Sequence, residues 1–304
     1  MSEGGVPSVA DAIREAATRL SAISDSARLD AELLMAHALG CKRSDMLLRG
    51  MRDPAPQGFD ALVARRSAHE PVAYITGSAE FYGLDLQVSP AVLIPRGDSE
   101  TLIETAREHF GTRAAPQRIL DLGTGSGALL LAALSLWPEA EGIGVDASLE
   151  ALTVAIANAQ RHANTAIGVV GEGQGEPPPF RADRGMARFI QRDWTMRGWH
   201  RDLGTFDLIL CNPPYVEEAA ALDPQVRDHE PASALFAGAE GLDDYRILLP
   251  QIRPLLTNTG IAIFEIGAAQ QGAVGEIARN QGFSPRFCKD LAKRPRAMIV
   301  SQSL

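Results

Sequence analysis

The tetrapeptide Asn212-Pro213-Pro214-Tyr215 contains the residue types in this sequence that are best suited to chemistry. It follows the apolar run 206–211, which predicts a buried strand, so it lies where a strand ends and a loop begins. Its two prolines stiffen the loop, because proline fixes φ and has no N–H to donate. Asn212 Oδ1 and the Pro213 carbonyl can accept both hydrogens of an –NH2 group, and Tyr215 can stack on its plane. Together with Pro214 they predict a site that holds a planar amino nitrogen in one orientation.

A second motif is the glycine turn Asp121-Leu122-Gly123-Thr124-Gly125-Ser126-Gly127, between a predicted strand and a predicted helix. Glycines at alternate positions let the backbone pass close to a ligand, because no Cβ stands in the way. An acid before three glycines spaced two apart differs from the dinucleotide pattern G-x-G-x-x-G and suits an aminoacyl-nucleoside better than a pyrophosphate. Asp121 orients the turn, binds a ligand ammonium group through water, or caps exposed backbone N–H groups.

Two carboxylates follow other predicted strands. Asp146 ends the strand 142–146, where it can accept hydrogen bonds from two ribose hydroxyls or cap the next helix. Asp193 ends the following strand. Ligands of parallel sheets bind beyond the carboxyl ends of the strands, and Gly123, Asp146, Asp193 and Asn212 all fall at such ends. The sequence therefore predicts that these four positions converge on one ligand site.

The elements that must position these residues alternate between strand and helix from residue 98 onwards, which predicts a mostly parallel sheet with helices on both faces. The last two strands follow one another closely, so they are expected to pair antiparallel. The predicted fold class is α/β, a doubly wound, Rossmann-like sheet of seven strands. Strands are expected near 118–122, 141–146, 187–192, 206–211, 260–266, 285–290 and 296–301. Helices are expected near 99–110 (with Asp98 as its cap), 127–136, 148–163, 242–256 and 269–281.

The N-terminal part predicts a small helical bundle. Ser8, with Asp11 three residues on, is typical of a helix cap, and a second helix over 27–39 is expected to stop at Gly40. A third helix is expected over 59–68. The residues expected to face the core are Val9, Ile13, Ala16 and Leu20 in the first helix and Leu29, Leu33, Ala36 and Leu39 in the second.

Three domains are expected: a helical substrate-docking domain over 1–78, a hairpin linker over 79–97 and a ligand-binding catalytic domain over 98–304. Alternation of Leu84, Leu86 and Val88 supports the hairpin. The helical domain is either a docking module for a protein partner or an appendage that only stabilises the catalytic domain, because fold alone does not fix function.

Composition excludes several classes of protein. The chain has 304 residues, of which 45% are hydrophobic and 22% charged, as in a globular protein. A net charge of −9 without an obvious basic patch argues against direct binding of nucleic acid. The three cysteines are isolated, and the six histidines show no ligand spacing, so neither a disulfide framework nor a metal site is expected. No apolar run of about 18 residues and no signal peptide is found, so no membrane contact is expected. The isolated cysteines suggest reduced thiols, so we expect a cytoplasmic protein, and we expect a monomer.

These motifs resemble those of S-adenosyl-L-methionine-dependent methyltransferases that modify planar amino nitrogens. Further segments resemble the release-factor glutamine N5-methyltransferase family (PrmC/HemK) from about Pro71 to the C-terminus, whereas the first 70 residues match only in helical character. Gly97 departs from the family, which usually has proline there, and should loosen the turn after Arg96. The matching segments are Pro71-Val72-Ala73-Tyr74-Ile75-Thr76-Gly77, Phe81-Tyr82-Gly83-Leu84, Leu93-Ile94-Pro95-Arg96-Gly97-Asp98-Ser99-Glu100, His229-Glu230-Pro231, Phe264-Glu265-Ile266-Gly267 and Lys289-Asp290-Leu291-Ala292.

The resemblance implies the class I methyltransferase fold and S-adenosyl-L-methionine as cofactor. It implies that the turn residues Gly123, Thr124, Gly125, Ser126 and Gly127 wrap the methionyl part, that Asp121 lies nearby and that Asp146 holds the ribose. Asp193 is then expected to accept from the adenine amino group, with Trp194 covering the ring or simply filling the core. Asn212 is expected to contact both cofactor and substrate. Arg96, Glu100 and Glu230 are expected to contact the substrate or fix the linker, or else to form plain ion pairs.

The implied reaction is methyl transfer to the side-chain N5 of a glutamine, with the Gly-Gly-Gln segment of peptide-chain release factors as the implied substrate. It needs neither a metal nor a strong general base, because the sulfonium supplies the activation and a methylated amide nitrogen loses its proton readily. Four alternatives stay open: methylation of a ribosomal-protein glutamine, adenine-N6 methylation of nucleic acid, a binding module without catalysis, and a nicotinamide-dependent oxidoreductase. The segment 164–186, rich in glycine and proline, predicts a flexible surface insertion.

Overall fold

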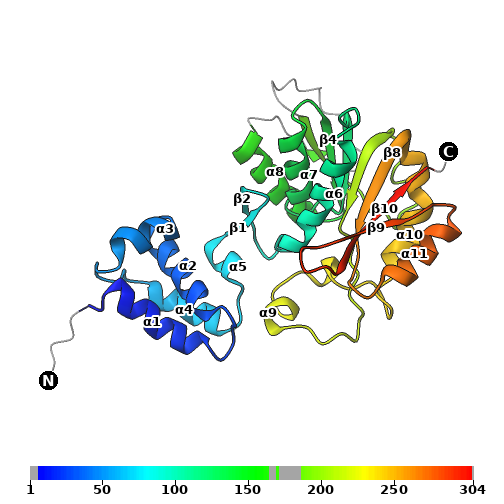
Figure 1. Cartoon of the computed structure of the whole chain (residues 1–304). Coiled ribbons are helices and arrows are strands. Elements are labelled where there is room, and N and C mark those ends of the chain that lie inside the picture. The colour runs from blue at the N-terminus through cyan, green and yellow to red at the C-terminus, as the bar shows by residue number, and fades with distance from the viewer. Residues whose placement is uncertain (1–5, 164–168, 171–185, 303–304) are drawn as a thin grey trace. The chain divides into compact units, whose positions relative to one another are not determined.

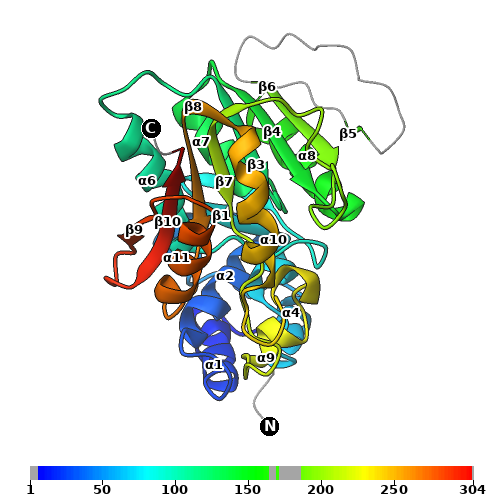
Figure 2. The same ribbon diagram turned by 90° about the vertical axis from the view of Figure 1, so that its right-hand side faces the viewer.

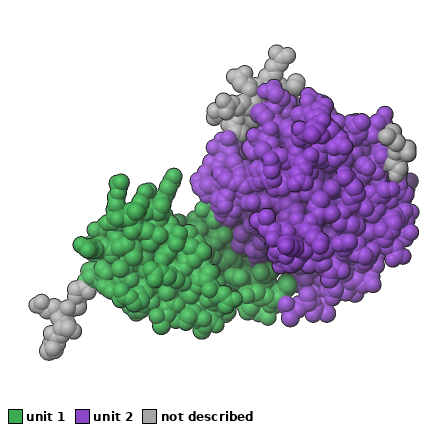
Figure 3. All heavy atoms as spheres, in the orientation of Figure 1, with its two compact units in different colours: residues 1–78, 222–229 green, residues 79–221, 230–304 purple. Residues whose placement is uncertain are grey.

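The computed structural model describes residues 6–163, 169–170 and 186–302, and these form two compact units. Unit 1 consists of residues 1–78 together with 222–229, and unit 2 of residues 79–221 and 230–304 (Figure 3). The expected insertion at 164–186 lies outside the described residues except for its residues 169–170 and 186. No helix among the described ranges is both long and apolar enough to cross a membrane.

Unit 1 is helical, and its first helix forms as its local sequence predicts. The Ser8 side chain accepts a hydrogen bond from the Asp11 N–H at 3.2 Å, and Val9, Ile13, Ala16 and Leu20 are all buried. The elements of this unit are α1 (Val9–Leu20), α2 (Ala27–Leu39), α3 (Arg43–Asp45), the π-helix η1 (Met46–Gly50), α4 (Phe59–Ser67), α5 (Val72–Thr76) and α9 (Pro224–Arg227).

The inward face of α2 agrees with the prediction only in part: Ala36 is buried as expected. The helix ends at Gly40 in the left-handed conformation as expected, but Leu29 and Leu33 are 43% and 37% exposed. The core-facing side of α2 instead contains Leu34 and buried Asp30, whose carboxylate pairs with Arg66 of α4 at 2.8 Å. The partner of Asp30 lies 36 positions away, so the hydrophobic pattern of the helix alone cannot show this contact.

Unit 2 contains an eight-stranded sheet in the order β5-β6-β4-β3-β7-β8-β10-β9. The seven predicted strands all occur, the pairs from β5 to β8 are parallel, and β10 pairs antiparallel with both β8 and β9, as expected for the last two strands. The additional strand is the two-residue β5 at the edge. The strands are β3 (Arg118–Leu122), β4 (Glu141–Asp146), β5 (Val169–Val170), β6 (Met186–Gln191), β7 (Phe206–Cys211), β8 (Leu256–Glu265), β9 (Arg286–Lys289) and β10 (Pro295–Ser301).

Helices cover both faces of this sheet (Figures 1 and 2). Alternate residues of a strand face opposite sides, so Leu208 and Leu210 of β7 join one core and Ile209 and Cys211 the other. The first core includes α6 (Glu100–Phe110), α7 (Ala128–Leu136) and α8 (Leu149–Ala163), and the second includes α10 (Asp243–Ile252) and α11 (Gln271–Asn280). This burial on both faces explains why the strands read as continuous apolar runs.

The remaining elements of unit 2 are short. The hairpin of β1 (Ser78–Phe81) and β2 (Leu84–Gln87) forms its own two-stranded sheet, with Leu86 buried. The other elements are the 3-10 turns η2 (Gly97–Ser99), η3 (Ala232–Ala234) and η4 (Arg253–Leu255). The prediction that Asp98 caps α6 is wrong: its carboxylate lies 3.0 Å from Arg294 and 2.9 Å from Arg296. The segment that leads into η2 borders the cavity described next.

Candidate active site

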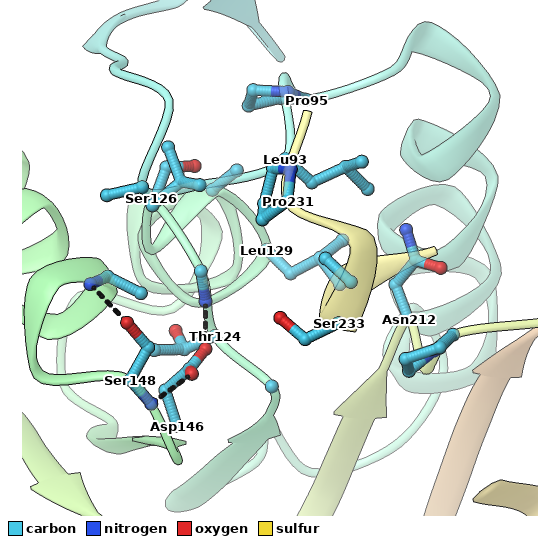
Figure 4. Close-up of a pocket in the computed structure, with 18 of the residues that line it drawn as sticks. Leu93, Pro95, Thr124, Ser126, Leu129, Asp146, Ser148, Asn212, Pro231 and Ser233 are labelled. Atoms are coloured by element: carbon cyan, nitrogen blue, oxygen red, sulfur yellow. Dashed lines mark hydrogen bonds between the residues drawn. The ribbon is translucent and has the colours of Figure 1, made fainter. Parts of the chain in front are cut away.

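A cavity of about 380 Å³ opens at the carboxyl ends of β3, β4, β6 and β7, within the size range of small-molecule sites. Figure 4 shows Asp146 on one side of the cavity and Asn212 on the other. Of the residues predicted for the site, those lining the cavity are Arg96, Gly123, Thr124, Gly125, Ser126, Asp146, Asp193, Trp194, Asn212 and Pro214. Asp121, Gly127, Pro213, Tyr215 and Glu230 are not among the lining residues.

The glycine turn brings backbone to the cavity wall. The N–H groups of Gly123 and Thr124 both donate to the Val145 carbonyl at 2.9 Å, which ties the turn to β4. Gly123 has φ +69°, and a Cβ built there would lie 3.0 Å from the ring of Trp194. Glycine is therefore required at this position for two separate reasons, the left-handed backbone and the close approach of Trp194.

Replacing Gly123 with alanine should weaken binding of the cavity's ligand by at least about tenfold, because the turn must shift to relieve both the φ strain and the contact with Trp194. Gly40→Ala is the matched control, because Gly40 has φ +64° but no atom lies within 4 Å of the position that a Cβ would take there. Both variants should lose stability in thermal unfolding, but only Gly123→Ala should lose affinity in calorimetric titration with S-adenosyl-L-methionine, the cofactor expected from the sequence. Equal affinities of the two variants would contradict this account of the turn.

Asp121 lies behind the turn and is 1% exposed. Its Oδ2 accepts a hydrogen bond from Thr124 Oγ1 at 2.7 Å, whereas its Oδ1 is buried and has no hydrogen-bond partner among the described residues. Burial raises the pKa of Asp121 to about 7, although the Thr124 hydrogen bond acts in the opposite direction. A buried acceptor without a donor is costly, so the structure holds this carboxylate behind the cavity wall at an energetic cost.

Asp146 is held by the backbone on both sides. Its Oδ2 accepts from the Gly125 N–H and its Oδ1 from the Ser148 N–H, each at 2.9 Å (Figure 4). Burial raises the pKa of Asp146, and the hydrogen bonds from Ser148 and Gly125 oppose that rise. These bonds fix the carboxylate at the cavity wall, where its remaining lone pairs can accept hydroxyl groups.

Asp193 and Trp194 line the cavity with roles that are partly structural. Asp193 Oδ1 accepts from the Thr195 N–H at 2.8 Å and from its hydroxyl at 2.6 Å, so this carboxylate already closes a local turn. Trp194 donates from Nε1 to Asp244 at 2.7 Å and packs against the core that contains α10. Its ring edge against Gly123 fixes the width of the cavity at this point.

Asn212 connects the cavity to a buried polar network. Its Nδ2 donates to Ser99 Oγ at 3.3 Å, and Ser99 Oγ donates to Glu265 Oε2 at 2.5 Å. Tyr215 points away from the cavity lining, because its hydroxyl donates to Glu265 Oε1 at 3.0 Å. Burial raises the pKa of Glu265, whereas the Ser99 hydrogen bond and the charge of Arg296 oppose the rise.

Arg96 and Glu230 form an ion pair beside the cavity. Glu230 is buried and also accepts from the Ile94 N–H at 3.4 Å, so the pair fastens the segment before η2 to the chain before η3. Glu100, in contrast, accepts from the Tyr82 N–H at 2.9 Å and holds the hairpin.

Ser99 and Glu265 are the residues that motif reasoning missed as parts of the site. Glu265 carried one usable signal, since it is a charged residue directly after the apolar run 261–264 at a strand end. Ser99 carried no signal beyond its place in the segment 93–100, which resembles the family, as does the segment 264–267 that contains Glu265. Within the described ranges, no group of three or more histidine, cysteine or acidic side chains is arranged to hold a metal ion.

The arrangement combines a backbone cradle, two carboxylates and an amide at one cavity. On one side, the Asp146 carboxylate at the wall can accept from hydroxyl groups of a ligand, and the charge of Asp121, behind the turn, favours a cationic group. The Asn212 amide and the carbonyl that follows it can bind a second group on the other side. Such a cavity can hold two reactants in contact, and this proximity is a main source of rate acceleration.

Comparisons with known proteins show which family the chain resembles. The family model described as PrmC N-terminal domain matches residues 11–77. Release factor glutamine methyltransferases are similar over most of the chain. The protein from Rhodospirillum rubrum is 37% identical over 279 residues, covering 90% of this chain and 78% of the relative. Those from Agrobacterium fabrum and Escherichia coli are 36% and 35% identical, covering 93% and 94% of this chain and 93% and 96% of the relatives.

Among solved structures, the catalytic domain of hMettl16 in complex with the MAT2A 3'UTR hairpin 6 is similar, with a TM-score of 0.52 and 14% identity. The similarity covers 80% of this chain and 82% of that one. At this identity the likeness concerns the fold alone, and it agrees with the doubly wound sheet of unit 2.

Proposed function

Because this chain belongs to the family of release factor glutamine methyltransferases, we propose that it transfers a methyl group from S-adenosyl-L-methionine to the side-chain N5 of a glutamine in a peptide-chain release factor. The observation that carries the proposal is the position of Asn212, at a strand end and on the wall of the same cavity as the glycine turn and Asp146. An amide-binding group and a cradle for an aminoacyl-nucleoside therefore share one space.

The residues present fit this cofactor. The Asp121 carboxylate, which lies behind the turn and does not line the cavity, can stabilise a cationic ammonium group of the cofactor by its charge or through water. Asp146 has lone pairs left for a ribose diol, and the left-handed backbone at Gly123 and Gly125 leaves room for a ligand chain. Trp194 offers a flat surface at the cavity wall. When bound, S-adenosyl-L-methionine would supply an activated methyl group on its sulfonium.

The contribution of the chain itself is alignment. An amide nitrogen is a poor nucleophile, because its lone pair is shared with the carbonyl. Asn212 Oδ1 and the Pro213 carbonyl can accept the two N–H bonds of the substrate amide, fix the direction of its nitrogen, and favour the positive charge that develops there. Holding both reactants in this way can lower the barrier by up to roughly 7–11 kcal/mol, and fixed dipoles add to this. The arginine of the Arg96–Glu230 pair offers donors to a substrate backbone at the cavity edge.

The alternatives considered from the sequence are not favoured. The relatives that cover most of the chain are named for release factors, and none of the three described above is named for a ribosomal-protein or nucleic-acid substrate. The proposed substrate belongs to the translation machinery, so we expect the protein to act in the cytoplasm and, as a monomer, to dock its substrate through unit 1.

The proposal is tested by incubating the protein with isotopically labelled S-adenosyl-L-methionine and purified release factors. The expected result is a 14-dalton increment on the glutamine of the Gly-Gly-Gln segment, located by mass spectrometry after proteolysis. A release factor with that glutamine changed to alanine is the control and should gain no label. Labelling of DNA, RNA or a ribosomal protein with none on release factor would overturn the proposal.

A further inference from the structure

We propose that Glu265 is a positioning residue which, through Ser99, sets the orientation of the Asn212 side-chain amide and so presents its oxygen to the substrate. The inference rests on the proposed function, because it assumes that Asn212 Oδ1 accepts an N–H of the methylated group. It concerns a carboxylate that does not line the cavity and that the proposed reaction does not otherwise use.

The register of the sheet brings these residues together. Cys211 of β7 pairs with Phe264 of β8, so the next residues along the two parallel strands, Asn212 and Glu265, lie at the same level of the sheet. Ser99 lies between them from the turn η2, with Oγ 3.3 Å from Asn212 Nδ2 and 2.5 Å from Glu265 Oε2. Ser99 and Glu265 are 4% and 1% exposed, so bulk water cannot readily replace either partner.

The chemistry of the three groups fixes the direction of each hydrogen bond. An ionised carboxylate only accepts, so the single hydroxyl hydrogen of Ser99 is directed to Glu265. Ser99 can then only accept from Asn212, which places Nδ2 on the Ser99 side and leaves Oδ1 on the other side of the amide plane. None of the described residues donates to Oδ1. The two ends of an asparagine amide are nearly equal in shape, so a network of this kind is what distinguishes them.

A neutral amide in place of Glu265 would not impose this direction. A buried carboxylate is costly, and its nearest cation, Arg296, is 3.9 Å away with one of its own nitrogens buried and unpartnered. A glutamine could donate to Ser99, whose hydroxyl would then be free to donate to Asn212 Oδ1 and reverse the amide. The acceptor-only character of the carboxylate is therefore the property that the site requires.

The test begins with Glu265→Gln, which keeps the size of the side chain. We expect the kcat for release factor methylation to fall by roughly 10²-fold, as for a small misplacement of a reacting group. The Kd for S-adenosyl-L-methionine should change by less than about twofold, because Glu265 does not line the cavity. Asp207→Asn is the matched control: this carboxylate accepts from Thr257 at 3.0 Å, at the opposite end of the same strand pair, and its loss should leave kcat unchanged.

The coupling through Ser99 is tested with two more variants. Ser99→Ala should lower kcat about as much as Glu265→Gln, and the double variant should lose no more than the larger single loss, because both changes break one chain of hydrogen bonds. Ser99→Thr, which keeps the hydroxyl, should recover most of the kcat that alanine loses. If the fold losses in kcat of the two single variants multiply in the double variant, the two residues act independently, and the proposed coupling through Ser99 is wrong.

An NMR measurement tests the orientation without any release factor. The sequence has five asparagines, so selective labelling gives few side-chain amide signals, and Asn212→Asp identifies the one from Asn212. Wild-type protein should show a contact between the Asn212 Nδ2 hydrogens and the Ser99 Cβ hydrogens, which weakens or disappears in Glu265→Gln. A wild type that shows this contact but does not methylate release factors would refute the proposed function, while the orientation of the Asn212 amide by Ser99 and Glu265 would still hold. An unchanged contact and unchanged kcat in Glu265→Gln would overturn the positioning role alone.

Discussion

Replacing Asn212 with alanine should reduce the kcat for glutamine methylation by roughly 10²–10³-fold, as removal of one preorganised hydrogen-bond partner does at other sites. The variant would lose the proposed side-chain acceptor for the substrate nitrogen, which in our proposal acts together with the Pro213 carbonyl. Affinity for S-adenosyl-L-methionine should stay within a few-fold of wild type, because the glycine turn, Asp121 and Asp146 lie on other strand ends. Single-turnover kinetics with labelled cofactor, combined with calorimetric titration, measures both quantities.

The control for this variant is Asn258→Ala, which makes the same truncation at an exposed residue of β8. It should retain both kcat and cofactor affinity. If Asn212→Ala keeps wild-type turnover, the acceptor role is wrong. If it loses cofactor binding and turnover together, Asn212 acts on the cofactor rather than on the substrate amide.

Replacing Asp121 with asparagine should stabilise the ligand-free protein at pH 8 and weaken its binding of S-adenosyl-L-methionine by at least tenfold. A carboxylate whose folded-state pKa is raised from 3.8 to about 7 binds more protons folded than unfolded, so its contribution to the free energy of unfolding falls as pH rises between these values. The complete change corresponds to about 4 kcal/mol at most. The stability difference between variant and wild type should therefore grow from pH 4 to pH 7 and level off above it.

Urea unfolding of wild type and Asp121→Asn over this pH range measures the difference in the free energy of unfolding. Glu104→Gln is the control, because it should change stability in the opposite direction. Arg107 and Tyr82 lower the pKa of Glu104 from 4.5, so this carboxylate contributes stability above that pH and loses it as pH falls. The Glu104→Gln variant should have a lower free energy of unfolding than wild type near pH 7, and this difference should become smaller as the pH falls. Parallel stability curves for wild type and Asp121→Asn would refute the buried charge at Asp121.

The pH dependence of cofactor binding is a second test of the role of Asp121. An ionised carboxylate favours a cationic ammonium group, so the affinity of wild type for S-adenosyl-L-methionine should rise with pH through about 7. The Asp121→Asn variant lacks this group, and its affinity should lose that dependence. If Asp121→Asn has a higher free energy of unfolding but a lower affinity for S-adenosyl-L-methionine, then the charge of Asp121 destabilises the free protein and stabilises the complex.

The fold could be predicted because its signals are local. Strands buried on both faces appear as apolar runs, and the alternation of strands and helices implies parallel pairing. The predictions failed where a distant partner decided the outcome. Asp98 looks like a helix cap, but Arg294 and Arg296 bind its carboxylate from almost 200 positions away. On α2, apolar residues occur on most of the surface, so the pattern does not single out one side, and the buried side contains Asp30 paired with distant Arg66.

The sequence by itself determined which groups stand at the strand ends, because motifs such as Asn212-Pro213-Pro214-Tyr215 and the glycine turn at 123–127 are contiguous and their backbone geometry is local. Only the tertiary structure decided how these groups are held. Ser99 and Glu265 are separated by 166 positions and meet through the pairing of β7 with β8 and the docking of η2 beside them. Hydrogen-bond direction depends on such through-space contacts, so the orientation of the Asn212 amide follows from packing and not from the motif that contains it.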